Sequence, residues 1–360
     1  MYDVIVIGGG VIGLSIAREI APGKSLLLLD RGATGEGASW AAAGILSPLS
    51  EADEPGPFFE LCRASHALFR EFVERLQQET GVDCGYAAAG LISLASSEES
   101  SSVFRRQYEW QRKAGFEVEF LSPGDVRSME PLVTAKISAA LFMPAEGSVV
   151  PRRLVNAIRE SCIKRKVDIR TGVRVDSISR NAVRAGNAIF EAASIIVASG
   201  VWSPEIAGLD PPIPVHPRKG QILSLRMPAG AFRRMIRWQH SYFVPRNMGE
   251  LVVGATDEDA GFDPSITPAG IGRLLADAQE ISSHVAEYPI LETWTGLRPA
   301  TPDGLPNLGP TLIPGVYYAT GHYRNGILLT PITAAIMAAL VDQRRPDVEI
   351  GPFSPARFKI

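Results

Sequence analysis

Two short apolar segments near the start of the chain do not alternate with polar residues. Residues 4–7 read VIVI, and residues 25–30 read SLLLLD. Strands that are apolar on both faces are typical of a parallel sheet with both sides covered. Between them, GGGVIGLSIAREI has apolar residues at helical spacing from about Val11. The pattern predicts a strand, a glycine turn, a helix and a second strand.

The same pattern returns twice further along the chain. A helix is predicted over 152–165 and a buried strand over 195–198, and later a strand over 315–321 is followed at once by a helix after Gly326. The segments between them read as amphipathic helices (58–79, 98–114 and about 269–285) and short strands of antiparallel type. We therefore expect an α/β fold in which a doubly wound domain of non-contiguous segments accompanies a mixed antiparallel β-sheet domain. The expected division is 1–50, 149–212 and 291–360 for the first domain, and 51–148 and 213–290 for the second.

The glycine turn fits G-x-G-x-x-G with Gly8, Gly10 and Gly13. These positions allow a tight turn, close approach of a pyrophosphate and close helix–strand packing, and the helix N-terminus favours the phosphates. Asp30 ends the next strand, at the spacing of a carboxylate that accepts hydrogen bonds from ribose hydroxyls. A glycine-rich turn without function is the alternative, but the order of strand, glycines, helix, strand and acid favours dinucleotide binding. The motif alone does not distinguish NAD from FAD.

Composition narrows the classes of partner. The 36 Lys and Arg residues against 39 Asp and Glu give a net charge of -3, so we expect neither nucleic-acid nor membrane binding. Three scattered cysteines predict a reducing, cytoplasmic setting, and the N-terminus lacks the basic region of a signal peptide. The five histidines show no paired ligand spacing, so no metal site is expected.

Seven segments together resemble a known family, the FAD-dependent amino-acid and amine oxidases of the D-amino-acid oxidase type, and within it most of all the glycine oxidases of thiazole (thiamine) biosynthesis. They are IGGGVIGLSIA, GASWAAAGILSP, ASGVWS, HSYFVPR, LVVGAT, GLRPATPDGLPNLG and GHYRNGILLTP, in this order over the whole chain. The resemblance implies that the doubly wound part is a Rossmann-type FAD-binding domain and the other a substrate domain. It also implies a homo-oligomer, with a tetramer as the expected form. FAD is expected to be non-covalent, because no cysteine lies in the flavin-proximal segments.

The resemblance also implies which residues meet FAD. Gly8, Gly10, Gly13 and Asp30 hold the ADP half, and Val173 contacts the adenine side. Ala198 and Gly200 lie on the pyrophosphate side, while the segment with Ser39 passes beneath the flavin. The full expected set adds Val11, Ile12, Arg31, Ala42, Ala43, Gly44, Trp202, Arg324, Asn325, Gly326 and Ile327.

Three residues are expected to act on the substrate. A guanidinium group binds a carboxylate through two parallel hydrogen bonds, and by the resemblance Arg298 does so here. Tyr242 is expected to add a hydrogen bond to the same carboxylate. Arg324 is expected near the flavin and the substrate, where the following helix directs its positive end at the flavin. From the residues alone, a surface arginine beside the Asp303–Gly304 turn is the favoured interpretation of Arg298, and only the resemblance reverses this preference. Strand packing is the alternative for Tyr242.

The implied reaction is oxidation of glycine, and of sarcosine or small D-amino acids, by hydride transfer to the flavin. The expected products are the keto acid, ammonia and, with dioxygen as acceptor, hydrogen peroxide. A D-amino-acid dehydrogenase that uses a quinone and a non-catalytic FAD-binding module are the alternatives. One departure concerns Asp257, after LVVGAT, where family members can carry methionine. An acid there either alters substrate preference or points to solvent.

Overall fold

Five parallel strands form the centre of the first sheet, as the apolar segments predict. The computed structural model describes residues 1–52 and 54–358, and all elements below lie within them. An antiparallel strand extends one edge, and the β9–β10 pair (Ser177–Ser179 and Ala182–Ala185) extends β11 outside the main order. The strand order is β17 (Asn307–Pro310), β18 (Val316–Thr320), β11 (Ala188–Val197), β1 (Tyr2–Ile7), β2 (Leu26–Leu29) and β8 (Asp168–Arg170).

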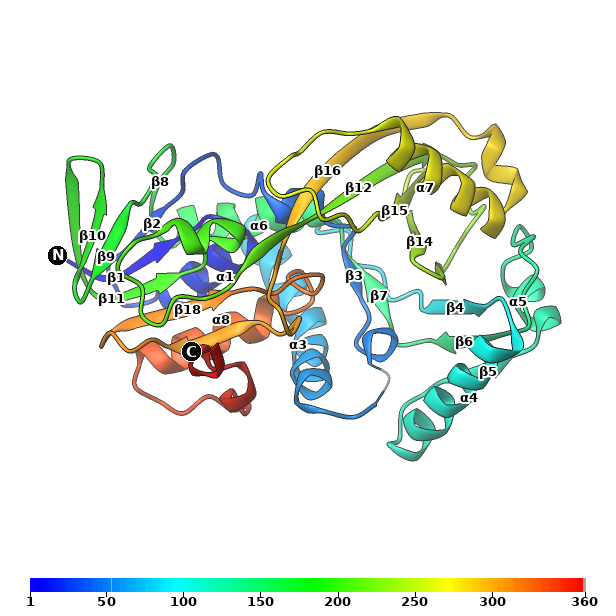
Figure 1. Cartoon of the computed structure of the whole chain (residues 1–360), viewed down its shortest axis with the longest axis horizontal. Coiled ribbons are helices and arrows are strands. Elements are labelled where there is room, and N and C mark those ends of the chain that lie inside the picture. Colours follow the sequence, from blue (N-terminus) through cyan, green and yellow to red (C-terminus); the bar gives the residue numbers. More distant parts are fainter. Residues whose placement is uncertain (53, 359–360) are drawn as a thin grey trace.

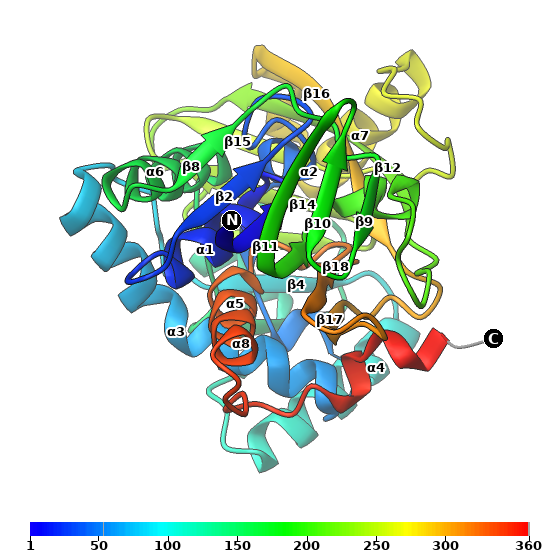
Figure 2. The same cartoon turned by 90° about the vertical axis from the view of Figure 1, so that its left-hand side faces the viewer.

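Both faces of the centre of this sheet are buried, which explains why β1 from Val4 onward and all of β2 are apolar. Val4 and Leu28 face helices, whereas Ile5 and Leu27 face the side of β9 and β10. Figure 2 shows α1, α3 and α8 on one side of β1 and β11, with β9 and β10 on the other. The covering helices are α1 (Val11–Ile20), α3 (Pro57–Thr80), α6 (Pro151–Lys164) and α8 (Thr330–Val341).

The second sheet is mostly antiparallel, and only β13 and β4 pair in parallel. Its order is β16 (Ile290–Ala300), β12 (His216–Arg226), β15 (Glu250–Gly254), β14 (Ser241–Arg246), β13 (Met235–Trp238), β4 (Leu91–Ala95), β6 (Ala139–Met143) and β5 (Glu119–Leu121). The helices α5 (Pro123–Met129) and α7 (Pro268–Ile281) cover one face, and α4 (Glu98–Lys113) packs on the other.

The long strands β12 and β16 connect the two parts of the molecule (Figure 1). The inner face of their sheet contacts α2 (Ala38–Ala41) and the segment that follows it. This segment contains β3 (Ile45–Leu46), which pairs antiparallel with β7 (Gly147–Ser148). Because β16 pairs with β12, residues 291–300 are part of the second sheet, although the expected division assigns them to the first domain. The division into two domains otherwise stays a prediction.

The final helix begins later than expected. Its first residue is Thr330, although a helix directly after Gly326 was predicted. Pro331 occupies the first turn, where its missing N–H costs nothing, and the preceding residues form tighter turns with Thr330 N–H donating to Ile327 O. The predicted helix 269–285 likewise ends at Ile281, followed by a 3₁₀ turn at Ser283–Glu287. No helix in the described part of the chain is long and apolar enough to cross a bilayer.

Candidate active site

A cavity of about 480 Å³ lies between the carboxyl ends of β1, β2 and β11 and the inner face of the second sheet. Of the residues expected to meet FAD or act on the substrate, Gly13 alone does not line it. The residues brought together are Gly8, Gly10, Val11, Ile12, Asp30, Arg31, Ser39, Ala42, Ala43, Gly44, Val173, Ala198, Gly200, Trp202, Tyr242, Arg298, Arg324, Asn325, Gly326 and Ile327. Their roles stay predictions, but one cavity contains them.

The first glycines make the turn between β1 and α1 close enough for a pyrophosphate. Gly8 has a φ of +109° and lies against the backbone of Ala198, so a side chain there would collide with the end of β11. Gly13 lies against Gly8, and a Cβ on Gly13 would overlap the Gly8 carbonyl oxygen. Gly13 therefore sets the distance between helix and strand rather than contacting a ligand.

Two polar side chains complete the phosphate and ribose end. Ser39 Oγ accepts a hydrogen bond from Val11 N–H at 2.9 Å, so its hydroxyl lies at the N-terminus of α1. Asp30 accepts from the N–H of Gly9 at 2.5 Å and of Gly32 at 2.7 Å. Burial raises the pKa of Asp30 above its ordinary value despite these bonds. A carboxylate at the end of β2 and a helix N-terminus facing one cavity fit the ADP half of FAD.

The far end of this region is bordered by an aromatic ring. Arg31 lies over the ring of Trp202, with its guanidinium carbon 4.9 Å from the ring centroid. Its Nη1 lies 3.5 Å from Glu205 Oε2. Val173 lines the same cavity, next to the loop that follows β8. A flat apolar surface beside a cation is suitable for stacking a planar base.

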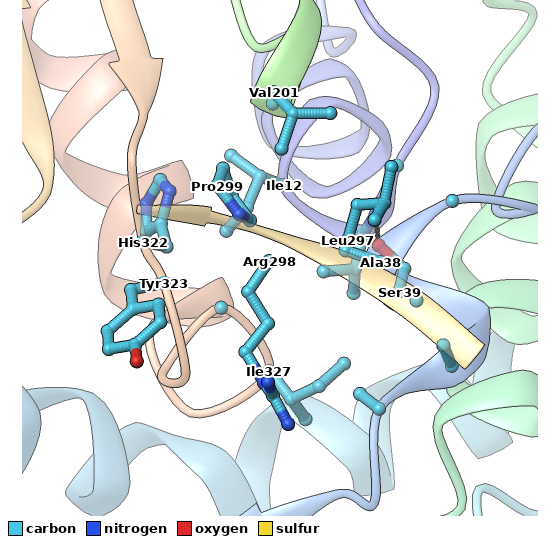
Figure 3. A pocket seen from close by; sticks show the side chains of 18 of the residues that line it. Ile12, Ala38, Ser39, Val201, Leu297, Arg298, Pro299, His322, Tyr323 and Ile327 are labelled. Carbon is cyan, nitrogen blue, oxygen red and sulfur yellow. Dashed lines mark hydrogen bonds between the residues drawn. The ribbon is translucent and has the colours of Figure 1, made fainter. Parts of the chain in front are cut away.

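Tyr242 and Arg298 come from different strands to the opposite end of the cavity. Tyr242 lies on β14 beside Gly254 of β15, where a Cβ would approach its hydroxyl to 2.5 Å. Arg298 lies on β16 beside Gly220 of β12, where a Cβ would collide with the guanidinium group. Glycine at these two positions therefore creates the space that both side chains occupy. Figure 3 shows Arg298 between His322 and Tyr323 on one side and Ala38 and Ser39 on the other.

The guanidinium of Arg298 is held by backbone carbonyls and not by an acid. Its Nη1 donates to Thr256 O at 3.1 Å and to Lys219 O at 3.4 Å. Among the described residues, the nearest carboxylate contact is Asp257 Oδ1, at 3.9 Å. The side chain is 18% exposed, so its charge is largely removed from water without a close counterion. Such a site favours binding of an anion.

Two titratable rings that line this end of the cavity, those of Tyr242 and His322, are neutral at neutral pH. Burial raises the pKa of Tyr242, although the positive charges of Arg298 and Arg324 oppose the shift. The phenol therefore stays protonated and can donate a hydrogen bond. Burial lowers the pKa of His322 to about 3, and its Nε2 lies 3.1 Å from Thr333 Oγ1. An uncharged, hydrogen-bonded histidine of this kind is a structural neighbour of the site.

Arg324 is paired with an acid of the protein itself. Its Nη2 lies 2.9 Å from Asp257 Oδ2, and its side chain is 44% exposed. The sequence predicted a substrate carboxylate or the flavin as the anion near this arginine. The contact with Asp257 is one that the sequence did not reveal.

A second ion pair at this end was also missed. Arg237 of β13 lines the cavity, and its Nη1 lies 3.4 Å from Glu51 Oε1. Arg237 is directly opposite Tyr242 in the β13–β14 hairpin. That register was a usable signal, because a residue paired with a site tyrosine faces the same side of the sheet. Glu51 lies in a 3₁₀ turn after α2, and nothing in its sequence context indicates that it would contact Arg237.

Comparison with known proteins agrees with this arrangement. Residues 3–340 match the family described as FAD dependent oxidoreductase. The chain is 37% identical to the bifunctional protein ThiO/ThiG of Synechocystis sp. over 369 positions, covering 99% of this chain and 54% of that protein. The chain thus spans about half the length of these bifunctional relatives.

Two relatives match along almost their entire length. The glycine oxidase of Geobacillus kaustophilus is 33% identical over 99% of this chain and 97% of its own. Its crystal structure has a TM-score of 0.96 at 32% identity, covering 100% of this chain and 99% of that one. The structure of iminodiacetate oxidase from Chelativorans sp. BNC1 has a TM-score of 0.89 at 26% identity and covers 98% of both chains. With a cavity that fits FAD and a family match over most of its length, this chain belongs to the FAD dependent oxidoreductases.

Proposed function

We propose that this protein oxidises glycine, and also sarcosine and small D-amino acids, to the oxo acid and hydrogen peroxide, with ammonia released from the primary amines and methylamine from sarcosine. One observation carries the proposal: the guanidinium of Arg298 lies in the FAD cavity with no carboxylate of the described chain closer than 3.9 Å. An α-amino acid brings the carboxylate that this group lacks. The length and identity of the match to glycine oxidases support glycine as the substrate.

The residues of the chain bind and orient the substrate. Arg298 binds the carboxylate, and the protonated hydroxyl of Tyr242 donates a hydrogen bond to it. FAD, held by the glycine turn and Asp30, would supply the acceptor for a hydride equivalent from the substrate Cα and the route by which its electrons reach dioxygen. The substrate amine, bound neutral, needs no general base, in keeping with the neutral His322 beside the site. Apolar side chains such as Ile222 and Leu91 line the same cavity and exclude water from the reacting carbon.

The proposal is tested by product stoichiometry in air. Each glycine consumed is expected to yield one glyoxylate, one ammonia and one hydrogen peroxide, with one dioxygen taken up. Glyoxylate, ammonia, peroxide and oxygen uptake are measured on the same reaction mixture. A flavin that glycine reduces but that only an added quinone reoxidises would instead identify a dehydrogenase. Product formation without peroxide would therefore contradict the oxidase reaction.

A further inference from the structure

One carboxylate, that of Asp257, contacts the guanidinium groups of three arginines beside the cavity. Its Oδ1 lies 3.0 Å from Arg218 Nε and 3.9 Å from Arg298 Nη1. Its Oδ2 lies 2.9 Å from Arg324 Nη2 and accepts a hydrogen bond from the Tyr323 hydroxyl at 2.8 Å. Asp257 follows β15 and does not line the cavity itself. Any effect of its charge on a ligand in the cavity would therefore pass through the arginines that it contacts.

The strand register explains why an acid is needed at this position. Arg218 of β12 is directly opposite Arg298 of β16, and like charges paired across strands repel. Burial by itself would raise the pKa of Asp257. Hydrogen bonds from Arg218 and Tyr323 and the charge of Arg324 outweigh this effect, so the pKa lies below its ordinary value. The carboxylate is charged at neutral pH and offsets part of the positive charge of the cluster.

The cations that line the substrate end differ in how closely they are paired. Arg324 has Asp257 at 2.9 Å, and Arg237 has Glu51 at 3.4 Å. Arg298 has only backbone carbonyl partners and a carboxylate at 3.9 Å. Of these three cations, Arg298 alone has no close counterion. The charge pattern therefore matches a ligand with one carboxylate.

We propose that Asp257 is a specificity-determining residue that limits the site to ligands with one carboxylate by keeping Arg324 engaged. The inference rests on the proposed function for its substrates, since glycine and sarcosine carry one carboxylate and iminodiacetate carries two. Without the charge of Asp257, Arg298 and Arg324 would present two unpaired guanidinium groups to the cavity. A dicarboxylate would then gain hydrogen bonds from both.

The test compares acetate with malonate as ligands of the FAD-loaded protein, so that no turnover is required. Binding is followed through the change in flavin absorbance. In Asp257→Asn, the ratio of malonate affinity to acetate affinity is expected to rise by about tenfold or more over the wild-type ratio. Asp257→Glu retains the charge and is expected to keep the ratio close to the wild-type value.

Asp259→Asn is the matched control, because Asp259 is an exposed acid of the same loop that forms no ion pair within the described residues and reaches the cluster only through the more distant charge of Arg218. It removes the same charge from the surface and is expected to leave the ratio unchanged. An unchanged ratio in Asp257→Asn, or an equal rise in Asp259→Asn, would overturn the proposal. A measurement on the wild type needs no variant: malonate bound about tenfold tighter than acetate would also overturn it.

Substrates extend the comparison to the reaction. Iminodiacetate and sarcosine are both secondary amines. The ratio of their rates of flavin reduction at low concentration, iminodiacetate over sarcosine, is expected to rise by about tenfold in Asp257→Asn, in line with the ratio of affinities. An equal increase in the rate of flavin reduction for both substrates would contradict a role of Asp257 in distinguishing dicarboxylates from monocarboxylates. Failure of the proposed function would give a different result, a wild-type flavin that neither glycine nor sarcosine reduces. The ratio of malonate affinity to acetate affinity would still test the role of Asp257, because it does not depend on turnover.

Discussion

Replacing Arg298 with alanine is expected to weaken glycine binding by about 2–4 kcal/mol while FAD stays bound. The guanidinium group lies in the cavity and its closest partners are two backbone carbonyls, so its loss removes the cation that meets the substrate carboxylate. The dissociation constant of glycine is measured from the concentration dependence of flavin reduction without oxygen. Arg298→Lys keeps the charge but loses the bidentate geometry, and an intermediate effect is expected.

Arg226→Ala is the matched control for Arg298→Ala. Arg226 is an exposed arginine at the end of β12, the strand that pairs with β16, and it forms no ion pair within the described residues. Its replacement removes one positive charge from the same sheet and should leave glycine binding unchanged. An Arg298→Ala protein that loses FAD but binds glycine normally would show that the assignment of Arg298 is wrong.

Replacing Gly13 with alanine is expected to remove FAD from the purified protein. The added Cβ would overlap the carbonyl oxygen of Gly8 and lie 3.0 Å from its carbonyl carbon, so α1 must move away from β1. Both obstacles are backbone atoms that no side-chain rotation relieves. Such overpacking costs on the order of 3 kcal/mol of the free energy of unfolding, and it also displaces the amides at the helix N-terminus. FAD content after gel filtration and the thermal midpoint measure the two effects.

Gly272→Ala provides the comparison for Gly13→Ala. Gly272 also lies within a helix, α7, but apart from its chain neighbours and the backbone of its own helix no atom lies within 4 Å of the position of its Cβ. Alanine has a higher helix propensity by about 1 kcal/mol, so this variant should keep FAD and unfold at the same or a higher temperature. A Gly13→Ala protein with full FAD content and an unchanged midpoint would contradict the proposed packing role.

The local sequence pattern was sufficient to predict the fold around the glycine turn, where the nucleotide is expected to bind. A strand, three glycines, a helix and an acid follow one another within 30 residues, so their spacing encodes the turn between β1 and α1 directly. Gly13 agrees with only one of its two expected roles. Its position in the motif predicts helix–strand packing, and it lies against Gly8, but it does not line the cavity in which it was expected to hold the ADP half of FAD.

The substrate end depends on contacts between distant segments. Arg298 and Tyr242 were expected there only through family resemblance, because their meeting requires β16 and β14 to lie in one sheet. Asp257 was visible as a departure from the family, but its contacts with Arg218 and Arg324 depend on strand register and loop geometry. Periodicity cannot supply this information, since it shows which face a residue occupies but not what lies opposite.

The central claim is that this FAD-loaded protein takes electrons from a small α-amino acid held by Arg298. Anaerobic mixing of the purified protein with glycine, with the flavin absorbance followed over time, tests it most directly. The flavin is expected to bleach at a rate that saturates with glycine concentration. A spectrum that stays oxidised with glycine, sarcosine and D-alanine alike would contradict the claim.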